Sequence, residues 1–367
     1  MNTPRQWGAT RAPWFLWFAM LSFLSLNAYA DDLPASPPVV ISGFVDGYYA
    51  WNDNRPASHK SFVPGTGTSA EHADELALNL VAIELVRPAK PIGFHLSLVA
   101  GDGADVVHAG EPGVERHHRI RNLYQASVSY SKQKLTLEAG VYPSHIGFEG
   151  FFSKDNWNYT RGWLGELSPF YQTGVKASYA WSDRWSGQLH VLQGWQLIHD
   201  NNRSKSVGTQ IAYSGDRFGA SLNTLIGPEL ANDNRDVRFF GDLVATYKLT
   251  PKLTIAGSLD RGRQQLPTDT NANWLGVAAL GRYAFDERHA VAARVDRFRD
   301  PDAGISGTAQ TMSSATVTYE FRAAKHVILK AEARHDHSTA DVFDRHDGKS
   351  NQQNLAILGA VVTFGGQ

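Results

Sequence analysis

The sequence predicts an all-β fold: a transmembrane antiparallel β-barrel of about 16 strands, with short periplasmic turns and long extracellular loops. Three observations support this fold. Side chains alternate with a period of two, short and long connections alternate between the expected strands, and aromatic residues gather at one end of those strands. After residue 31, no apolar run reaches the roughly 20 residues that a spanning helix needs. The rest of the chain is therefore either soluble or crosses a membrane as strands.

The first thirty residues predict a secretory signal peptide. Arg5 and Arg11 precede an apolar run, Trp14–Leu26, which is followed by the small-x-small site Ala28–Ala30. Because this run is shorter than the roughly 20 residues of a spanning helix, we expect cleavage after Ala30 and not an uncleaved anchor. The expected segments are a signal peptide (1–30), a short periplasmic N-terminal segment (31–38) and the barrel (39–367).

Alternation defines the expected strands. In the window 327–336, apolar residues such as Leu329 alternate with charged residues such as Lys330, and the windows 243–247 and 291–296 repeat the pattern. One face of each strand is therefore apolar and the other polar, which suits strands placed between lipid and water. The expected strands lie near 39–51, 74–87, 91–101, 119–131, 134–143, 169–182, 185–197, 207–214, 217–227, 235–249, 252–262, 273–286, 288–299, 309–321, 326–337 and 351–364.

The connections between these strands alternate strictly in length. Short polar turns, such as 182–184 and 286–288, are followed by longer stretches rich in Gly, Asn, Asp and Pro, such as 52–73 and 338–350. Both termini fall on the side of the short turns. An even strand number with short turns on one side and long loops on the other is the pattern of bacterial outer-membrane barrels.

Aromatic side chains provide independent support. They lie at strand ends beside the short turns or the C-terminus, and they share the parity of the apolar residues in their strands. This is typical of an interfacial girdle, whereas a soluble β-sandwich would place aromatic residues near the middle of its strands. The residues are Tyr130, Tyr179, Trp181, Tyr213, Tyr247, Tyr283, Phe285, Tyr319, Phe321 and Phe364.

The inward parity of the strands carries charge of both signs. A barrel of about 16 strands encloses an aqueous channel, and burying so many charges without water would cost more than the net stability of a domain. The mixture of signs predicts weak ion preference. The inward charged residues are Arg238, Asp242, Arg294, Asp296, Lys330, Glu332 and Arg334, together with Glu84, Arg119, Arg121, Glu138, Lys176, Asp236, Lys248, Asp260, Arg282 and Asp336.

One long connection, residues 144–168, has an unusual composition. It combines aromatic residues with charges, and exposed aromatic residues at this density would form an adhesive surface patch. We expect the segment to fold into the barrel as a constriction, although its rings could instead pack among outer loops or at a subunit interface. The candidate solute contacts are Lys154, Asp155 and Arg161, with Glu149 and Glu166 as further constriction residues.

Several segments resemble one known family. These are GFVDGYYAWN at 43–52, GDGADV at 101–106, DNWNYTRG at 155–162, PFYQTGVKASYAWSDRW at 169–185 and GWQLIHDNNRSK at 194–205. The sequence is similar to the β-barrel porin type 2 (OmpL-like) family of Gram-negative bacteria along nearly all of the expected mature chain. The resemblance implies an outer-membrane channel and supplies no catalytic residues. Many outer-membrane barrels end on an aromatic residue, whereas here Phe364 is followed by three more residues.

Other classes of site find little support. The net charge of −1 provides no basic surface for nucleic acid, and the absence of cysteine excludes disulfides and thiolate metal sites. The pair His117–His118 and the segment His335–His337 lack the three or four convergent ligands of a metal site, and Gly101–Asp105 lacks the closing Glu of an EF-hand and is expected to be a turn. No linear motif of a hydrolase or P-loop enzyme is present. We expect no metal and no cofactor.

These observations predict an outer-membrane porin for passive diffusion of small hydrophilic solutes or ions, and not an enzyme. A structural or adhesion barrel and an outer-membrane lipid hydrolase are the alternatives, since a barrel hydrolase needs no linear motif. The expected partners are outer-membrane lipids, small solutes, and periplasmic chaperones and the barrel-assembly machinery during biogenesis. The sequence does not define the oligomeric state.

Overall fold

The computed structural model describes residues 37–112 and 118–366, with the side chains of residues 118 and 119 left aside. The expected signal peptide, nearly all of the expected periplasmic segment, and His117 lie outside the described residues. Among the described residues, no helix has the length and apolar character needed to cross a bilayer.

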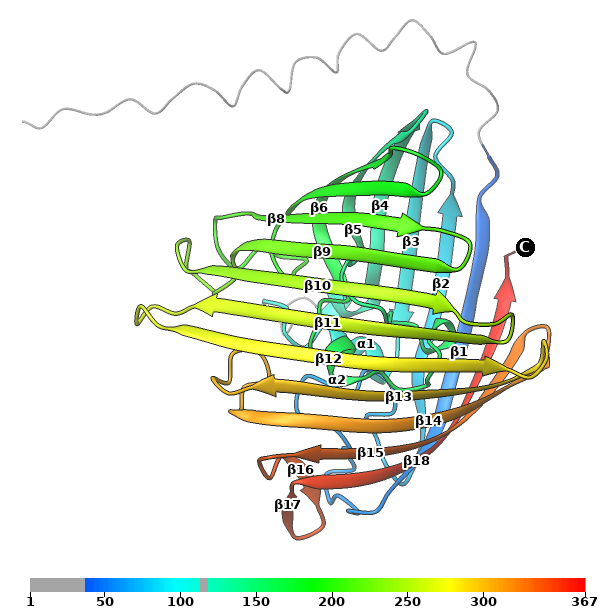
Figure 1. The fold of residues 1–367 in the computed structure, drawn as a ribbon, viewed down its shortest axis with the longest axis vertical. Helices are drawn as coiled ribbons and strands as arrows, with labels where there is room; N and C mark the ends of the chain where they lie inside the picture. Colours follow the sequence, from blue (N-terminus) through cyan, green and yellow to red (C-terminus); the bar gives the residue numbers. More distant parts are fainter. Residues whose placement is uncertain (1–36, 113–117, 367) are drawn as a thin grey trace, which may run out of the picture. The chain divides into compact units, whose positions relative to one another are not determined.

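Sixteen antiparallel strands form a closed barrel, which confirms the predicted fold (Figure 1). Each strand pairs with its neighbours in the chain, and β1 closes the ring by pairing with both β2 and β18. The strands are β1 (Val40–Asn52), β2 (Leu76–Arg87), β3 (Ile92–Ala100), β4 (Leu123–Lys132), β5 (Leu135–Pro143), β6 (Tyr171–Ala180), β7 (Trp185–Leu192), β8 (Ser206–Ser214), β9 (Phe218–Pro228), β10 (Val237–Lys248), β11 (Leu253–Gln265), β12 (Asn271–Ala284), β13 (His289–Asp300), β14 (Gln310–Ala324), β15 (Val327–Ser338) and β18 (Gln352–Gly365).

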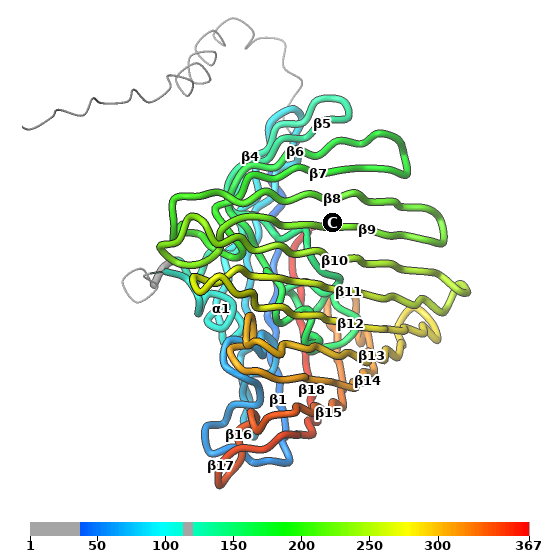
Figure 2. Tube along the Cα trace, turned by 60° about the vertical axis from the view of Figure 1, so that its left-hand side comes forward, coloured from blue at the N-terminus to red at the C-terminus, as the bar shows by residue number. Residues whose placement is uncertain are grey.

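Short elements lie in the long connections. The hairpin of β16 (Phe343–Arg345) and β17 (Gly348–Ser350) is a separate small sheet in the connection before β18. It projects beyond the neighbouring strand ends in both views (Figure 2). The remaining elements are the helices α1 (Asp102–Val107) and α2 (Trp163–Glu166) and the 3-10 turns η1 (His118–Asn122) and η2 (Ser153–Asp155). The expected turn at Gly101–Asp105 is thus wrong, because the amides of Ala104 and Asp105 bond back to the carbonyl of Gly101 and open helix α1.

Strand register places alternate residues on opposite faces of the wall. Val295, Val317 and Leu329 are 57%, 53% and 39% exposed on the outside. On the inside, Arg294 pairs with Thr316 and Thr316 with Arg334, so that one row of the inner face crosses β13, β14 and β15. The neighbouring inner row joins Asp296, Ser314 and Asp336 in the same way.

The outer face also carries the expected girdle of aromatic residues. Tyr130, Tyr179, Tyr247, Tyr283 and Tyr319 are all exposed at the ends of strands that adjoin short turns. An aromatic ring is stable at a membrane–water interface because its body is apolar and its edge is polar. The girdle therefore marks one boundary of the membrane-facing band.

Candidate functional site

The connection between β5 and β6, residues 144–170, lies inside the barrel, and we call it the inner loop. Its aromatic residues Phe151, Tyr159 and Trp163 are at most 2% exposed. The ring of Trp163 packs 6.3 Å from that of Phe62 and 6.1 Å from that of Phe343, measured between ring centroids. Burial of these rings supplies the apolar stabilisation of the loop, at about 25 cal/mol for each Å² removed from water.

Strand β15 anchors the inner loop through charged residues that include Glu332 and Arg334. The carboxylate of Glu332 accepts hydrogen bonds from the backbone amides of Tyr159 at 2.6 Å and Thr160 at 3.1 Å. The guanidinium of Arg334 donates to the hydroxyl of Thr160 at 3.1 Å and to the carbonyl of Arg161 at 2.5 Å. Polar backbone groups that the loop buries are thus satisfied by charges on the wall.

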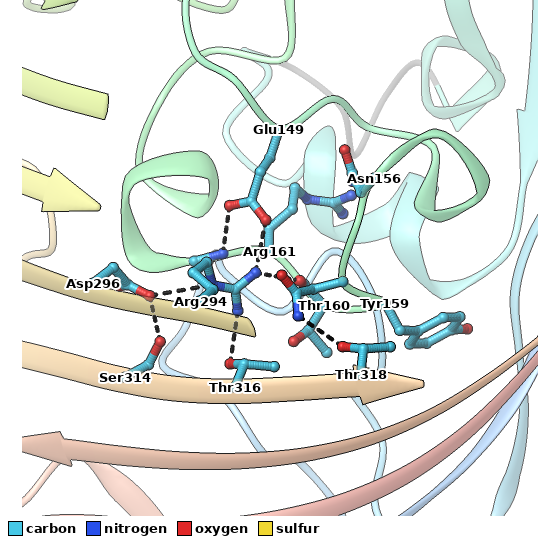
Figure 3. A network of polar contacts seen from close by, with 12 residues as sticks. Glu149, Asn156, Tyr159, Thr160, Arg161, Arg294, Asp296, Ser314, Thr316 and Thr318 are labelled. Atoms are coloured by element: carbon cyan, nitrogen blue, oxygen red, sulfur yellow. Dashed lines mark hydrogen bonds and ion pairs between the residues drawn. The ribbon is translucent and has the colours of Figure 1, made fainter. Parts of the chain in front are cut away.

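Strand β13 holds the next part of the loop (Figure 3). The guanidinium of Arg294 donates to Glu149 and to the carbonyl of Thr160, both at 2.7 Å. Asp296, beside it, accepts the amide of Trp163 at 3.0 Å and ion-pairs with Arg294 at 3.3 Å. The Arg294 and Asp296 side chains are fully buried, so each charge is compensated within the protein and not by water.

Strands β1, β15 and β18 complete the anchorage. Asp46 on β1 accepts hydrogen bonds from the hydroxyls of Tyr159 at 2.8 Å and Ser153 at 2.5 Å. Lys330 donates to the carbonyls of Ser153 at 2.9 Å and Asn156 at 2.6 Å. On β18, a Cβ added at Gly359 would lie 2.4 Å from the ring of Tyr159, so a residue without a side chain is needed where this ring approaches the wall.

Within the inner loop, Arg161 has a structural position. Its guanidinium donates to the carbonyls of Gly150 at 2.9 Å and Phe151 at 2.6 Å, lies 3.5 Å from Glu166, and is fully buried. Glu166 in turn accepts the amide of Gly67 at 2.9 Å and the hydroxyl of Thr68 at 2.9 Å. The charges of Arg161 and Glu166 therefore tie the inner loop to the connection between β1 and β2.

The five expected constriction residues occupy two kinds of position. Lys154 and Asp155 form an ion pair at 2.8 Å, with side chains 21% and 60% exposed. The side chains of Arg161 and Glu166 are at most 1% exposed, and that of Glu149 is 7% exposed. The position of Arg161 thus differs from that expected of a solute contact, because its guanidinium donates hydrogen bonds to carbonyl groups of its own loop.

The seven inward charges expected to line the lumen also have protein partners. All seven are less than 9% exposed: Arg238, Asp242, Arg294, Asp296, Lys330, Glu332 and Arg334. Asp242 accepts the amide of Gly147 at 2.9 Å, and Arg238 lies between the rings of Trp195 and Trp274, at 5.0 and 5.5 Å. The sequence predicted that water would surround these charges. In the structure, the inner loop, backbone groups and aromatic rings surround them instead.

Strands β2–β8 form a different inner wall, which we call the open wall. Glu138 and Lys176 pair at 2.6 Å with side chains 15% and 17% exposed, and Glu84 and His95 pair at 3.2 Å with side chains 19% and 29% exposed. The neutral residues Gln188 and Gln210 are also partly exposed on this wall. Sequence reasoning did not single out His95, Gln188 and Gln210 because they are uncharged, although they share the inward parity of their strands.

Two cavities lie at opposite ends of the strands. One, of about 450 Å³, lies at the short-turn end of β2–β5, where His95, Gln125 and Glu138 line it. The other, of about 330 Å³, lies at the long-loop end and is lined by residues that include Glu229 and Arg238. Burial raises the pKa of the Glu229 carboxyl, although the charge of Arg238 acts in the opposite direction.

A metal centre finds no support among the described residues, which contain no group of three or more His, Asp or Glu side chains able to hold an ion. His335 and His337 lie on the outer face of β15, where the nitrogen Nδ1 of His335 contacts the side-chain oxygen of Asn354 at 2.8 Å.

Comparison with known families identifies the chain. Residues 38–364 match the family described as "Putative beta-barrel porin-2, OmpL-like". The chain belongs to this porin family. It is accordingly a transmembrane β-barrel porin of the outer membrane. No curated protein sequence matches it.

Solved structures share the fold of this porin at low sequence identity. The anion-selective porin from Comamonas acidovorans is 12% identical with a TM-score of 0.61, and the comparison covers 89% of this chain and 99% of that one. The outer-membrane channel DcaP of Acinetobacter baumannii is 13% identical with a TM-score of 0.60, covering 89% and 97%. A loop-deletion mutant of OmpT, an outer membrane protein of Vibrio cholerae, is 9% identical with a TM-score of 0.60, covering 90% and 100%.

Proposed function

We propose that this porin is a passive diffusion channel for small hydrophilic solutes, and that the inner loop constricts its lumen. The main support for this proposal is that charged side chains are buried on the wall that holds the inner loop and partly exposed on the open wall. The loop is anchored on β1, β13, β15 and β18. On the open wall, in contrast, the ion pairs of Glu138 with Lys176 and of Glu84 with His95 stay partly exposed. The proposed solute path runs between the loop and the open wall.

The proposed solute contacts follow from this path. Lys154 and Asp155 are the exposed charges of the inner loop, and Glu138 and Lys176 are paired charges of the open wall. Each pair is neutral as a whole, so no ring of one sign forms among these residues. Rings of a single sign produce strong ion selectivity, and paired charges of opposite sign do not. We therefore propose weak preference between cations and anions.

Conductance in a planar bilayer tests the proposal. The purified full chain should give discrete ohmic steps, with a reversal potential close to zero across a salt gradient. A folded, heat-modifiable barrel that stays silent would overturn the channel proposal. Hydrolysis of lipid by that silent preparation would favour an outer-membrane hydrolase, and silence without activity would favour a structural or adhesion barrel.

A further inference from the structure

Four arginines lie on the outer face of the barrel at the long-loop ends of two strands. They are Arg261 and Arg263 on β11 and Arg297 and Arg299 on β13, and we call them the rim arginines. All four are exposed. They share the parity of Leu259 and Val295, which precede them on the same outer face and are 43% and 57% exposed. The rim arginines therefore point away from the lumen.

Strand register brings two of these arginines to the same level of the wall. Arg261 pairs with Leu275 on β12, and Leu275 pairs with Arg299 on β13. Two strand spacings separate their Cα atoms by roughly 10 Å, which two arginine side chains can bridge through a shared anion. A cavity of about 170 Å³ lies between them, lined by Arg261, Asn273, Trp274, Leu275, Arg299 and Pro301.

These positive charges lack compensation within the described residues. The guanidinium groups of Arg261, Arg297 and Arg299 have no hydrogen-bond or ion-pair partner there, and that of Arg263 donates to the side-chain oxygen of Asn271 at 2.9 Å. The nearby carboxylate of Asp302 accepts instead from the amide and the side chain of Asn273, at 2.9 and 3.3 Å. Clustered like charges repel one another, and a bound anion would remove that repulsion.

The surface next to the rim arginines is apolar. Leu243, Leu259, Val277 and Val295 are each more than 40% exposed on the outer face of β10–β13. In the strand register, Leu259 and Val277 lie two residues nearer the short turns than Arg261 and Arg299, and Arg297 pairs with Val277 in that same row. At the opposite, short-turn end of β10, β12 and β14, the same face carries the aromatic rings of Tyr247, Tyr283 and Tyr319. A positive rim above an apolar surface therefore distinguishes the long-loop end of this sector, which is extracellular in barrels of this kind.

We propose that the rim arginines bind an acylated, phosphorylated lipid of the outer leaflet. The phosphate groups occupy the cavity between Arg261 and Arg299, and the acyl chains lie along Leu259, Val277 and Val295. Guanidinium groups suit this ligand, because their planar fork donates two parallel hydrogen bonds to a phosphate. This site is on the outer surface of the barrel, so it is independent of the proposed diffusion path.

Native mass spectrometry of the purified full chain tests the site, with lipid A carrying two phosphates as the probe. The double variant R261Q/R299Q should bind this lipid roughly tenfold more weakly or worse, because two charge-assisted contacts are lost. The lipid affinity of R261K/R299K should fall between that of R261Q/R299Q and that of the wild type, since lysine keeps the positive charge but lacks the planar fork of donors. Folding, judged by heat-modifiable gel mobility, should be unchanged in both variants.

The matched control removes two positive charges at the other end of the barrel. K132Q/R184Q alters exposed residues beside short turns and should bind the lipid as the wild type does. Phosphatidylcholine should bind weakly to all variants, and excess inorganic phosphate should compete poorly because it has no acyl chains. The proposal is overturned if R261Q/R299Q binds normally, if the control loses affinity equally, or if inorganic phosphate alone binds as tightly as the lipid.

Discussion

Charged side chains differ in exposure between two inner walls of the same barrel. On β13 and β15, Arg294, Asp296, Arg334 and Asp336 have fully buried side chains. On the open wall, the pair of Glu138 and Lys176 keeps 15% and 17% of its side-chain surface exposed. The strand pattern is the same in both places, with apolar residues outward and polar residues inward. The difference arises because the inner loop covers the charges of β13 and β15, whereas its contacts with the open wall, such as the carbonyl of His145 that accepts from Gln210 at 3.1 Å, leave the pair of Glu138 and Lys176 partly exposed.

The comparison shows that inward parity does not by itself identify a solute contact. The β13–β15 wall uses its charges to satisfy the backbone of a loop that has no regular strand partner. A buried charge that lost its partner would be strongly destabilising, whereas a partly exposed pair contributes little to stability. One wall is therefore suited to hold the loop and the other to meet water.

The largest expected effect comes from removing the inner loop itself. Deleting Phe151–Arg161, with a short Gly-Ser bridge in its place, should raise single-channel conductance several-fold and admit larger solutes. Removing Asp344–Lys349 from the β16–β17 hairpin is the matched control and should leave conductance near that of the wild type. Unchanged conductance in a folded Phe151–Arg161 deletion would place the path elsewhere and remove the distinction between the walls.

Next in size is the loss of one buried charge. Arg334→Ala leaves the Asp336 carboxylate buried without its guanidinium, which lies 2.8 Å away, and should lower the free energy of unfolding by about 3–5 kcal/mol. Lys176→Ala on the open wall should cost at most about 1 kcal/mol, because Glu138 can be solvated. Urea unfolding of the barrel in liposomes measures both. Similar losses in the two variants would contradict the assignment of separate roles.

A third variant pair compares the lipid face with the open wall. Leu329→Arg places a charge on the outer face and should cost roughly 2–4 kcal/mol if the residue lies near the bilayer midplane. Gln188→Arg, on the partly exposed inner face, should assemble normally. The yield of heat-modifiable barrel reports the outcome. If both variants assemble equally well, the outward and inward assignments are wrong.

Much of the fold could be predicted from the sequence because alternation is local. The strand expected at 326–337 is Val327–Ser338, and the one expected at 217–227 is Phe218–Pro228. Each prediction needed only neighbouring residues, whose side chains point to opposite faces with a period of two. The same parity placed Arg294 and Glu332 on the inner side of their strands.

The partners of the inner loop could not be predicted in the same way. Glu149 meets Arg294 across 145 positions of the chain, and Thr160 meets Glu332 across 172. No local pattern encodes which wall a loop will contact. The sequence therefore predicted Arg161 as a solute contact, and it predicted that the aromatic residues of the loop point inward without indicating which residues they contact. The composition of the loop, in which rings and charges are mixed, was the signal that such partners existed.

The smallest expected effect concerns ion selectivity, and it tests directly which wall meets the solute. Glu138→Gln removes one partly exposed negative charge and leaves Lys176 without its ion-pair partner, so the reversal potential across a KCl gradient should shift modestly toward anion preference. Glu332→Gln removes a negative charge that is 4% exposed and accepts the loop amides. It should lower stability and leave the reversal potential unchanged, because no solute reaches it. If Glu332→Gln shifted the potential as much as Glu138→Gln in equally folded barrels, solutes would pass along the anchored wall, and the path beside β2–β8 would have to be abandoned.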